Sequence, residues 1–144
     1  SDISAGQIMD RTGRLLGLPF PSGKALDALA AASDCRELFR VKLNGLQFSL
    51  SGLENKVAQF RAQGHDDGQT ARYAVASVCH AVAAATAAAQ KQYPGLAVVF
   101  SGGVASNSML RARCAQFAPV FAQPQYSTDN ALGVAVLTYL QEAR

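Results

Sequence analysis

The sequence lacks several patterns that would assign a function at once. It has only three cysteines among 144 residues, and no two of them form a CxxC pair. Because such pairs are typical of metal and redox sites, we interpret Cys35, Cys79 and Cys114 as reduced core thiols. There is also no Ser/His/Asp arrangement, no nucleophile elbow and no HExxH motif, so the sequence gives no support for a peptidase.

Long apolar runs and clustered charges are missing as well. No run approaches the roughly 20 apolar residues of a membrane span, and no signal-peptide pattern opens the chain. We therefore expect a cytoplasmic protein that makes no membrane contact. The 13 basic residues are scattered along a chain of net charge +3, which is weak evidence for a nucleic-acid partner because phosphate-binding surfaces normally need a basic stripe.

The chain also has no initiator Met. It opens with "SDISAGQIMD", which has the character of the interior of a folded element, so we expect a piece of a longer protein. Within it, a composition of 49% hydrophobic residues suffices for one compact domain over residues 1–144. The second half reads as strand, glycine turn, helix, strand and helix, the pattern of an α/β fold.

Local patterns give the expected elements. An alanine-rich run without Gly or Pro predicts a central buried helix, and Ser51 with Glu54 fits a capping box. An apolar run before Gly102 is typical of a strand covered on both faces. Helices are predicted over 8–16, 24–33, 51–60, 70–92, 106–117 and 129–142, and strands over 48–50, 96–100 and 119–124, with no clear pattern over 34–47.

Gly102 and Gly103 follow the apolar strand directly. In open α/β sheets ligands bind at the carboxyl ends of strands, and the missing Cβ atoms give a ligand access to the main chain. A helix start just after them favours anions or polar ligand atoms. The alternative is a tight turn in which Ser106 or Asn107 caps the following helix.

Five ordered stretches strengthen the ligand interpretation. They read "GQIMDRTGRLLGLPFPSG", "FSLSGLEN", "ASVCHAV", "GGVASNSMLR" and "STDNALGVA". In this order they resemble "GEAFDKxAxLLGLxYPGG", "FSFSGLKT", "ASFQxAV", "GGVAANxxLR" and "CTDNAAMIA" of the glycoprotease-like family. That family makes the threonylcarbamoyl modification of tRNA adenosine, and the resemblance covers essentially the whole chain.

The resemblance implies a fold and a ligand. The chain would be the helix-rich carboxyl-terminal lobe of a two-lobed actin-like ATPase (ribonuclease-H-like) fold, with ATP or threonylcarbamoyl-adenylate between the lobes. Asp10, Gly23 and Asn107 match the family's ligand contacts, and the Gly102–Gly103 turn would allow a flat ligand to approach. A carboxylate such as Asp10 can accept hydrogen bonds from a ribose, although it could also be a surface carboxylate of an amphipathic helix.

The resemblance also implies a metal. Asp129 matches a ligand of a catalytic iron or zinc ion whose two histidine partners belong to the missing amino-terminal lobe; otherwise Asp129 is a helix cap. His65 and His80 are too far apart in sequence for that histidine pair. We expect His80 to be structural and His65 to lie in a solvated loop, where two neighbouring carboxylates could attract a cation.

The implied function is a tRNA threonylcarbamoyltransferase, a metal-dependent enzyme historically labelled an O-sialoglycoprotein endopeptidase. Its partners would be the amino-terminal lobe, tRNA and other subunits of the threonylcarbamoyl-transfer complex. We expect the isolated chain to be inactive, and to self-associate through apolar surface near Leu18, Phe20 and Val104.

Departures from the family pattern leave an alternative open. Gln7, Arg11, Ser22 and Glu54 replace Glu, Lys, Gly and Lys of the family motifs. They favour a non-catalytic paralogue that keeps the fold as a docking or regulatory partner. A small-molecule kinase of the actin-like superfamily fits less well, because "FSLSGL" and "STDNALG" have no role in its pattern.

Overall fold

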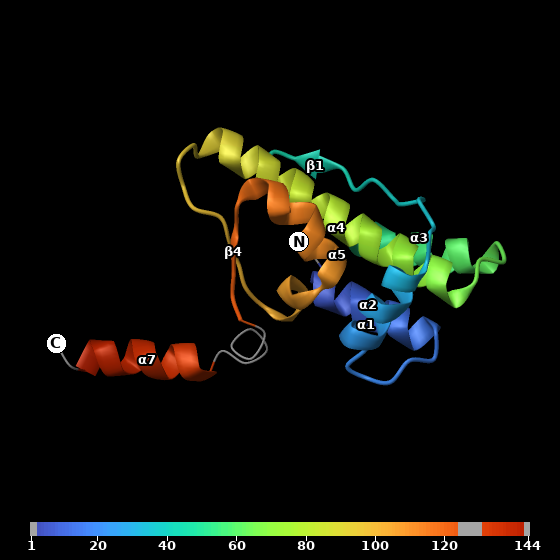
Figure 1. The fold of residues 1–144 in the computed structure, drawn as a ribbon, viewed down its shortest axis with the longest axis horizontal. Helices are drawn as coiled ribbons and strands as arrows, with labels where there is room; N and C mark the ends of the chain where they lie inside the picture. Colours follow the sequence, from blue (N-terminus) through green and yellow to red (C-terminus); the bar gives the residue numbers. More distant parts are fainter. Residues whose placement is uncertain (1–2, 124–130, 143–144) are drawn as a thin grey trace.

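The fold was analysed in a computed structural model that describes residues 3–123 and 131–142. It is helix-rich, with short strands (Figure 1). The helices are α1 (Ala5–Leu15), α2 (Gly23–Ala32), α3 (Ser51–Ala62), α4 (Asp67–Gln92), α5 (Ser108–Cys114) and α7 (Ala131–Glu142), with 3₁₀ turns η1 (Gly103–Ser106) and η2 (Ala115–Phe117). The strands are β1 (Leu43–Asn44), β2 (Gln47–Phe48), β3 (Val99–Phe100) and β4 (Val120–Phe121).

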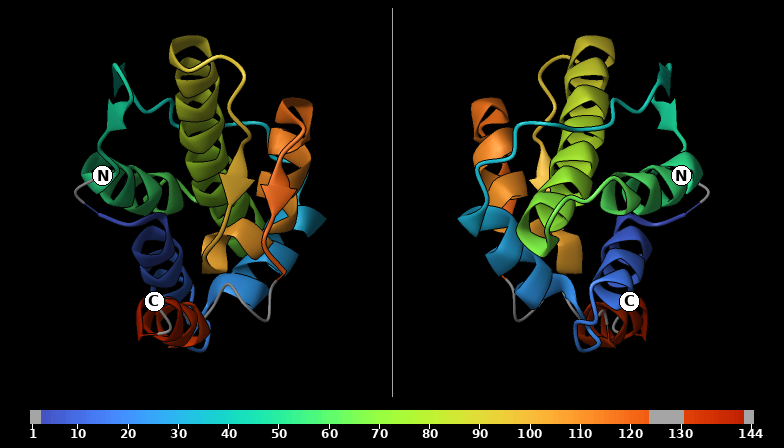
Figure 2. Two further views of the ribbon diagram at one scale, coloured as in Figure 1. Left: turned by 90° about the vertical axis from the view of Figure 1, so that its left-hand side faces the viewer. Right: turned by 90° about the vertical axis from the view of Figure 1, so that its right-hand side faces the viewer.

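Helix α4 is the centre of the core, as the alanine-rich run predicted. α1, α2, α3 and α5 all pack against it, and Figure 2 shows them on several of its sides. Val75, Val78 and Ala81 on α4 have no exposed surface. The many small side chains let neighbouring helices approach from several directions. α4 begins three residues earlier than predicted, because Asp66 caps its first turn in a reciprocal pair with Gln69.

By length and composition alone, α4 would also pass as a membrane span. Its most apolar 18-residue window has a mean hydropathy of 1.2, but one such helix is weak evidence for a membrane span. The core helix of a globular protein meets the same criterion, and the four helices around α4 explain its apolar composition.

The helix caps that the structure shows differ from the prediction in one case. Helix α1 begins with a capping box of Ser4 and Gln7, which gives Gln7 the same role a glutamate would have. The capping box predicted for α3 is wrong. Ser51 is the first residue of α3 and its side chain makes no cap; its hydroxyl lies 2.8 Å from that of Ser49, while Glu54 reaches to another helix.

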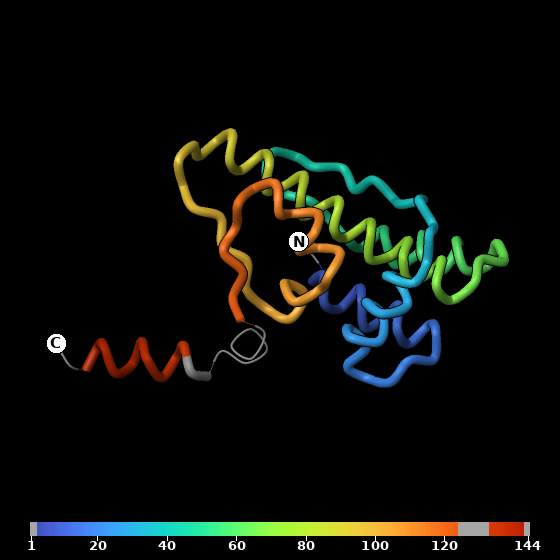
Figure 3. The backbone as a smooth tube through the Cα atoms, in the orientation of Figure 1, coloured from blue at the N-terminus to red at the C-terminus, as the bar shows by residue number. Residues whose placement is uncertain are grey.

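The segment before β1 is extended and runs along α4, as the smooth tube of Figure 3 shows. The Arg72 guanidinium donates a hydrogen bond to the Cys35 carbonyl at 2.8 Å. The Phe39 amide donates to the Ser77 hydroxyl, also at 2.8 Å. Two side chains of α4 therefore fix a stretch that has no clear hydrophobic pattern.

The described residues also contain two small, two-stranded sheets. β1 and β2 form an antiparallel pair, whereas β3 and β4 are parallel and joined through η1, α5 and η2. Phe100 lies opposite Phe121, and their rings stack at 5.2 Å toward the core. Val99 lies opposite Val120, and both are more than 60% exposed. The described residues are helix-rich with few strands, which is compatible with the predicted α/β fold, but the expectation that this strand is covered on both faces is wrong.

Helix α7 differs from the others because its apolar residues are exposed. Val134, Leu137, Tyr139 and Leu140 are all more than half exposed. Figure 1 shows α7 lying away from the remaining helices. The predicted helix over 129–142 is confirmed from Ala131 onward, and its first residues lie outside the described part of the chain.

Candidate functional site

The Gly102–Gly103 turn follows β3 and opens into η1. Gly102 has φ 93° and ψ 164°, a conformation that favours glycine. Gly103 has no such backbone requirement, and a Cβ at either position would meet no atom within 4 Å. Only one of the two glycines is therefore needed for the turn, and the space beside both is open.

Asn107 occupies the N-cap position of α5. Its Oδ1 accepts a hydrogen bond from the Leu110 amide at 2.9 Å, and its Nδ2 donates to Asp27 at 2.8 Å. The side chain is buried, with 6% exposure. The helix-cap alternative is thus confirmed for Asn107, while a contact with a ligand remains a prediction. The nearby Ser106 hydroxyl is buried and has no partner among the described residues.

Asp27 is a central residue of this region that sequence reasoning missed. Besides Asn107, its carboxylate accepts from the Ser108 amide and the Ser108 hydroxyl, each at 2.9 Å. A carboxylate is favoured at the free N–H groups of a helix start. The sequence carries no signal for this contact, because Asp27 and Ser108 are 81 residues apart.

Asp10 and Gly23 lie where α1 contacts the start of α2. Asp10 Oδ1 accepts a hydrogen bond from the Ser22 amide at 3.0 Å, which fastens α1 to the start of α2. Gly23 is the first residue of α2, and a Cβ there would meet nothing within 4 Å. A Cβ at Gly6 would lie 3.8 Å from Val104, so α1 packs against η1.

These contacts bring the predicted residues of α1, α2, η1 and α5 into one neighbourhood. Gly6 and Asp10 are one turn apart on α1 and share a face. The bonds of Asp10 and Asp27 hold the first two turns of α2 between α1 and α5. The arrangement has open backbone at three glycines and two carboxylates that are engaged in hydrogen bonds within the protein.

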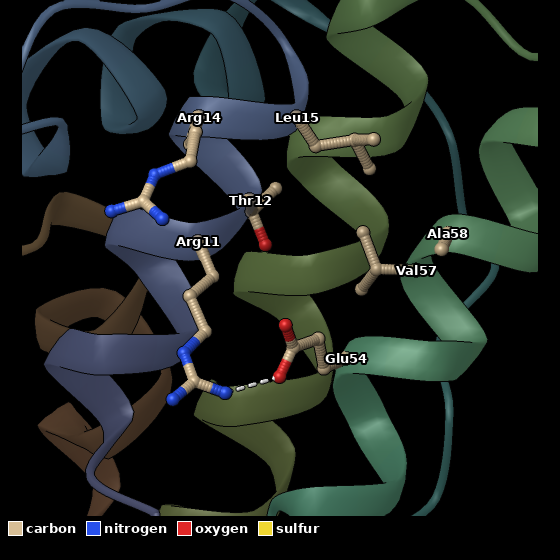
Figure 4. Close-up of a pocket in the computed structure, with 7 residues that line it drawn as sticks. All are labelled: Arg11, Thr12, Arg14, Leu15, Glu54, Val57 and Ala58. Atoms are coloured by element: carbon tan, nitrogen blue, oxygen red, sulfur yellow. Dashed lines mark hydrogen bonds and ion pairs between the residues drawn. The ribbon is translucent and has the colours of Figure 1, made fainter.

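A separate pocket of about 260 Å³ lies between α1 and α3. Arg11 and Glu54 face each other across it and form an ion pair, whereas Arg14 points away from Glu54 (Figure 4). Both positions are lysines in the family motifs quoted above. The charge reversal at Glu54 is therefore matched by a partner, and the two departures are neighbours in space.

A second pair of departures compensates in volume. The family motif has Ala where this chain has Gly13, and Gly where it has Ser22. A Cβ at Gly13 would lie only 2.1 Å from the Ser22 Cβ, far closer than two carbons can pack. The site between α1 and α2 thus holds one side chain, which comes from position 22 here and from position 13 in the family pattern.

The candidate metal ligand Asp129 lies outside the described residues. Within 3–123 and 131–142, no three His, Cys, Asp or Glu side chains gather closely enough to hold a metal ion. The iron or zinc site that includes Asp129 therefore stays a prediction.

His65 and its two neighbouring carboxylates have partners within the protein, and a cation at this position stays a prediction. The His65 ring stacks on Phe60 with the ring centroids 3.6 Å apart. Both neighbouring carboxylates are engaged, because Asp66 caps α4 and Asp67 pairs with Arg61 at 2.6 Å.

The three cysteines are unpaired thiols, as predicted. Burial is the main cause that raises the pKa of Cys79 to about 12, and burial also raises the pKa of Cys114. Both thiols are therefore protonated at neutral pH and pack as small apolar groups.

Comparison with known proteins identifies the family that this chain resembles. A family model described as tRNA N6-adenosine threonylcarbamoyltransferase matches residues 1–136. Proteins of that name from Moorella thermoacetica, Chlorobium phaeobacteroides and Anaeromyxobacter sp. are 31%, 33% and 36% identical to this chain, over 99%, 99% and 94% of its length. The matches cover only 46%, 48% and 45% of those relatives. The chain thus spans slightly less than half the length of the curated relatives it matches.

Proposed function

The chain belongs to the tRNA N6-adenosine threonylcarbamoyltransferase family, and from this membership we propose that it is the nucleotide-binding, carboxyl-terminal lobe of such an enzyme. The lobe has the actin-like, ribonuclease-H-like architecture and acts in the cytoplasm. In the reaction, the N6 amine of a tRNA adenosine attacks the carbamoyl carbonyl of threonylcarbamoyl-adenylate. The C–N bond forms, AMP leaves and the amine loses a proton.

The observation that carries this proposal is the open space beside Gly102 and Gly103. The adenosine part of ATP or of the adenylate lies against this turn, with Gly23 and Asp10 on the facing helices. Asp10 keeps one carboxylate oxygen on the Ser22 amide, so its other oxygen accepts from the ribose. Asn107 holds the turn in place from behind as the cap of α5.

The rest of the enzyme supplies what this chain lacks. We propose that Asp129 is one ligand of an iron or zinc ion, whose remaining ligands come from an amino-terminal lobe. Because catalytic zinc sites normally use three protein ligands, this chain alone neither holds the metal tightly nor catalyses the transfer. The other partners in this proposal are tRNA and further subunits of the transfer complex.

A non-catalytic paralogue is the second candidate, favoured by the departures at Gln7, Ser22 and Glu54. The structure gives each of these residues a stabilising role, in a helix cap, in the α1–α2 contact and in an ion pair. Compensated departures of this kind preserve the fold and do not by themselves remove the nucleotide site. We therefore favour the enzyme lobe.

Calorimetric titration of ATP into the protein tests the proposal. Gly103→Val should weaken binding at least tenfold, because the side chain enters the space assigned to the ligand. Gly52→Val is the matched control, since its Cβ position at the start of α3 is equally open. Unchanged ATP affinity in Gly103→Val would show that the glycines only make a turn.

Asn107→Ala separates two roles of one side chain. As a helix cap alone, its loss lowers the free energy of unfolding by about 1 kcal/mol. If Asn107 also contacts the ligand, ATP binding weakens by about 1–2 kcal/mol in addition.

A further inference from the structure

Arg113 and His80, which are far apart in the sequence, are in contact in the structure, and Arg40 acts electrostatically on the same histidine. Arg113 at the end of α5 has its Nη2 atom 3.4 Å from Nδ1 of His80 on α4. Arg40, from the extended segment before β1, lies close enough to act on His80 electrostatically. We refer to Arg40, His80 and Arg113 as the basic cluster.

The backbone around the basic cluster is fixed. The Phe39 amide is bonded to the Ser77 hydroxyl, which in turn donates to the Tyr73 carbonyl at 2.6 Å. Ser77 and His80 are three residues apart on α4 and therefore share a face. Arg40 directly follows Phe39, so the bond to Ser77 holds the backbone next to Arg40 against the face of α4 that carries His80.

The two arginines of the cluster form no ion pair with a carboxylate of the described residues. Within the described part of the chain, the ion pairs are Arg11 with Glu54 and Arg61 with Asp67. Neither includes Arg40 or Arg113, and both of these side chains are exposed. Like charges that are held together in this way repel one another unless an anion binds between them.

The histidine contributes a neutral donor. Burial, Arg113 and Arg40, in that order, lower the pKa of His80, so the ring is uncharged at neutral pH. Since a guanidinium can only donate, Nδ1 accepts from Arg113 and Nε2 carries the hydrogen. The cluster therefore offers two guanidinium groups and one ring N–H, and every one of these groups is a donor.

We propose that the basic cluster binds the phosphate backbone of RNA. Guanidinium groups match phosphate oxygens in charge and in fork geometry. The identification of that RNA as the tRNA substrate rests on the function proposed above. Arg113 and Asn107 are at opposite ends of α5, about 9 Å apart along its axis. An RNA bound at the cluster is thus close to the α5 start that follows the turn proposed to hold the adenylate.

Fluorescence anisotropy with a labelled tRNA anticodon stem-loop tests this site. The variant Arg40→Gln/Arg113→Gln lowers the net charge from +3 to +1, and so does the control Lys56→Gln/Lys91→Gln on exposed positions of α3 and α4. At 50 mM salt the cluster variant should bind about tenfold more weakly than wild type. Its salt dependence should lose a slope of about 1.4–1.8, as expected for two lost phosphate contacts.

The control variant should keep most of the affinity and of the slope. Equal weakening in both variants would overturn the proposal, because net charge alone would then explain the binding. Absence of RNA binding by the wild-type chain at 50 mM salt would overturn it as well. Inorganic phosphate at matched ionic strength should not displace the stem-loop; displacement would identify a site for the free anion instead.

This test and the ATP titration fail independently. Loss of RNA binding with ATP binding retained supports the cluster. A cluster-dependent RNA affinity without any ATP binding contradicts the nucleotide-lobe proposal and leaves the RNA site standing. Thermal unfolding of the cluster variant should match wild type, since both replaced side chains are exposed.

Discussion

Two parts of the molecule treat their apolar residues in opposite ways. In the helical body, which we define as α1 to α5, Leu26, Leu53 and Val75 have no exposed surface. In the carboxyl-terminal part, defined as β3, β4 and α7, Leu137 is 67% exposed and Val99 64%. The sequence patterns are similar, but only the body has a central helix that its neighbours surround.

The comparison shows which elements are stabilised by contacts within this chain. Parallel strands are almost always covered on both faces, yet β3 and β4 are covered on the side of Phe100 and Phe121 only. We infer that the body is stable as it stands, and that the carboxyl-terminal part is completed by another chain segment or by a second copy.

Leu→Ala substitutions in the helical body and just before β3 should give the largest contrast. Leu26→Ala leaves a cavity between α2 and α4 and should lower the free energy of unfolding by about 2–5 kcal/mol. Leu96→Ala, just before β3, removes a side chain that is 68% exposed and should cost less than about 0.5 kcal/mol. Urea denaturation of both variants measures the difference.

Similar losses in the free energy of unfolding for the two variants would contradict the predicted difference between the two parts. They would mean that the region of Leu96 is covered in solution. A loss at Leu26 that is also small would show that the helical body is less tightly packed than its burial indicates.

The contact between α1 and α2 provides a test of intermediate size within the body. Gly13→Ala should destabilise the protein by about 1–3 kcal/mol, because the added methyl group collides with Ser22. Gly13→Ala/Ser22→Gly restores the family pattern and should recover most of that loss. A double variant as unstable as Gly13→Ala would rule out the exchange of one side chain between the two positions.

Sequence patterns predicted the body well because its signals are local. Helical periodicity, and the Gly and Pro residues that interrupt it, gave the positions of α1, α2, α4 and α5. The cap of α3 was mispredicted, because Glu54 finds Arg11 on another helix instead of its own backbone. Whether a side chain pairs within its helix or with a neighbour is decided by packing, and packing cannot be read from a four-residue motif.

The candidate site was predictable in its glycines and less so in its polar contacts. The φ angle of Gly102 and the cap at Asn107 follow from residue types next to each other in sequence. Asp27 was missed because its partners lie about 80 residues away. The basic cluster was missed for the same reason, since its members look scattered until the fold brings them together.

The smallest effect on stability is expected in α7, and it gives the last test of the comparison. Leu137→Lys/Leu140→Lys places charges on side chains that are more than half exposed, so unfolding of the body should change by less than about 0.5 kcal/mol. Exposed apolar patches drive association, and this chain exposes apolar side chains both on α7 and on one face of β3 and β4. We therefore expect wild-type protein to self-associate in sedimentation experiments.

The α7 variant should shift that equilibrium toward monomer. Asn55→Lys/Gln63→Lys adds the same two charges to exposed positions on and just after α3 and should leave association unchanged. A wild-type chain that stays monomeric across a wide concentration range would contradict exposure of α7 in solution. The apolar face of α7 would then be covered within its own molecule, and its apolar residues would be buried as they are in the body.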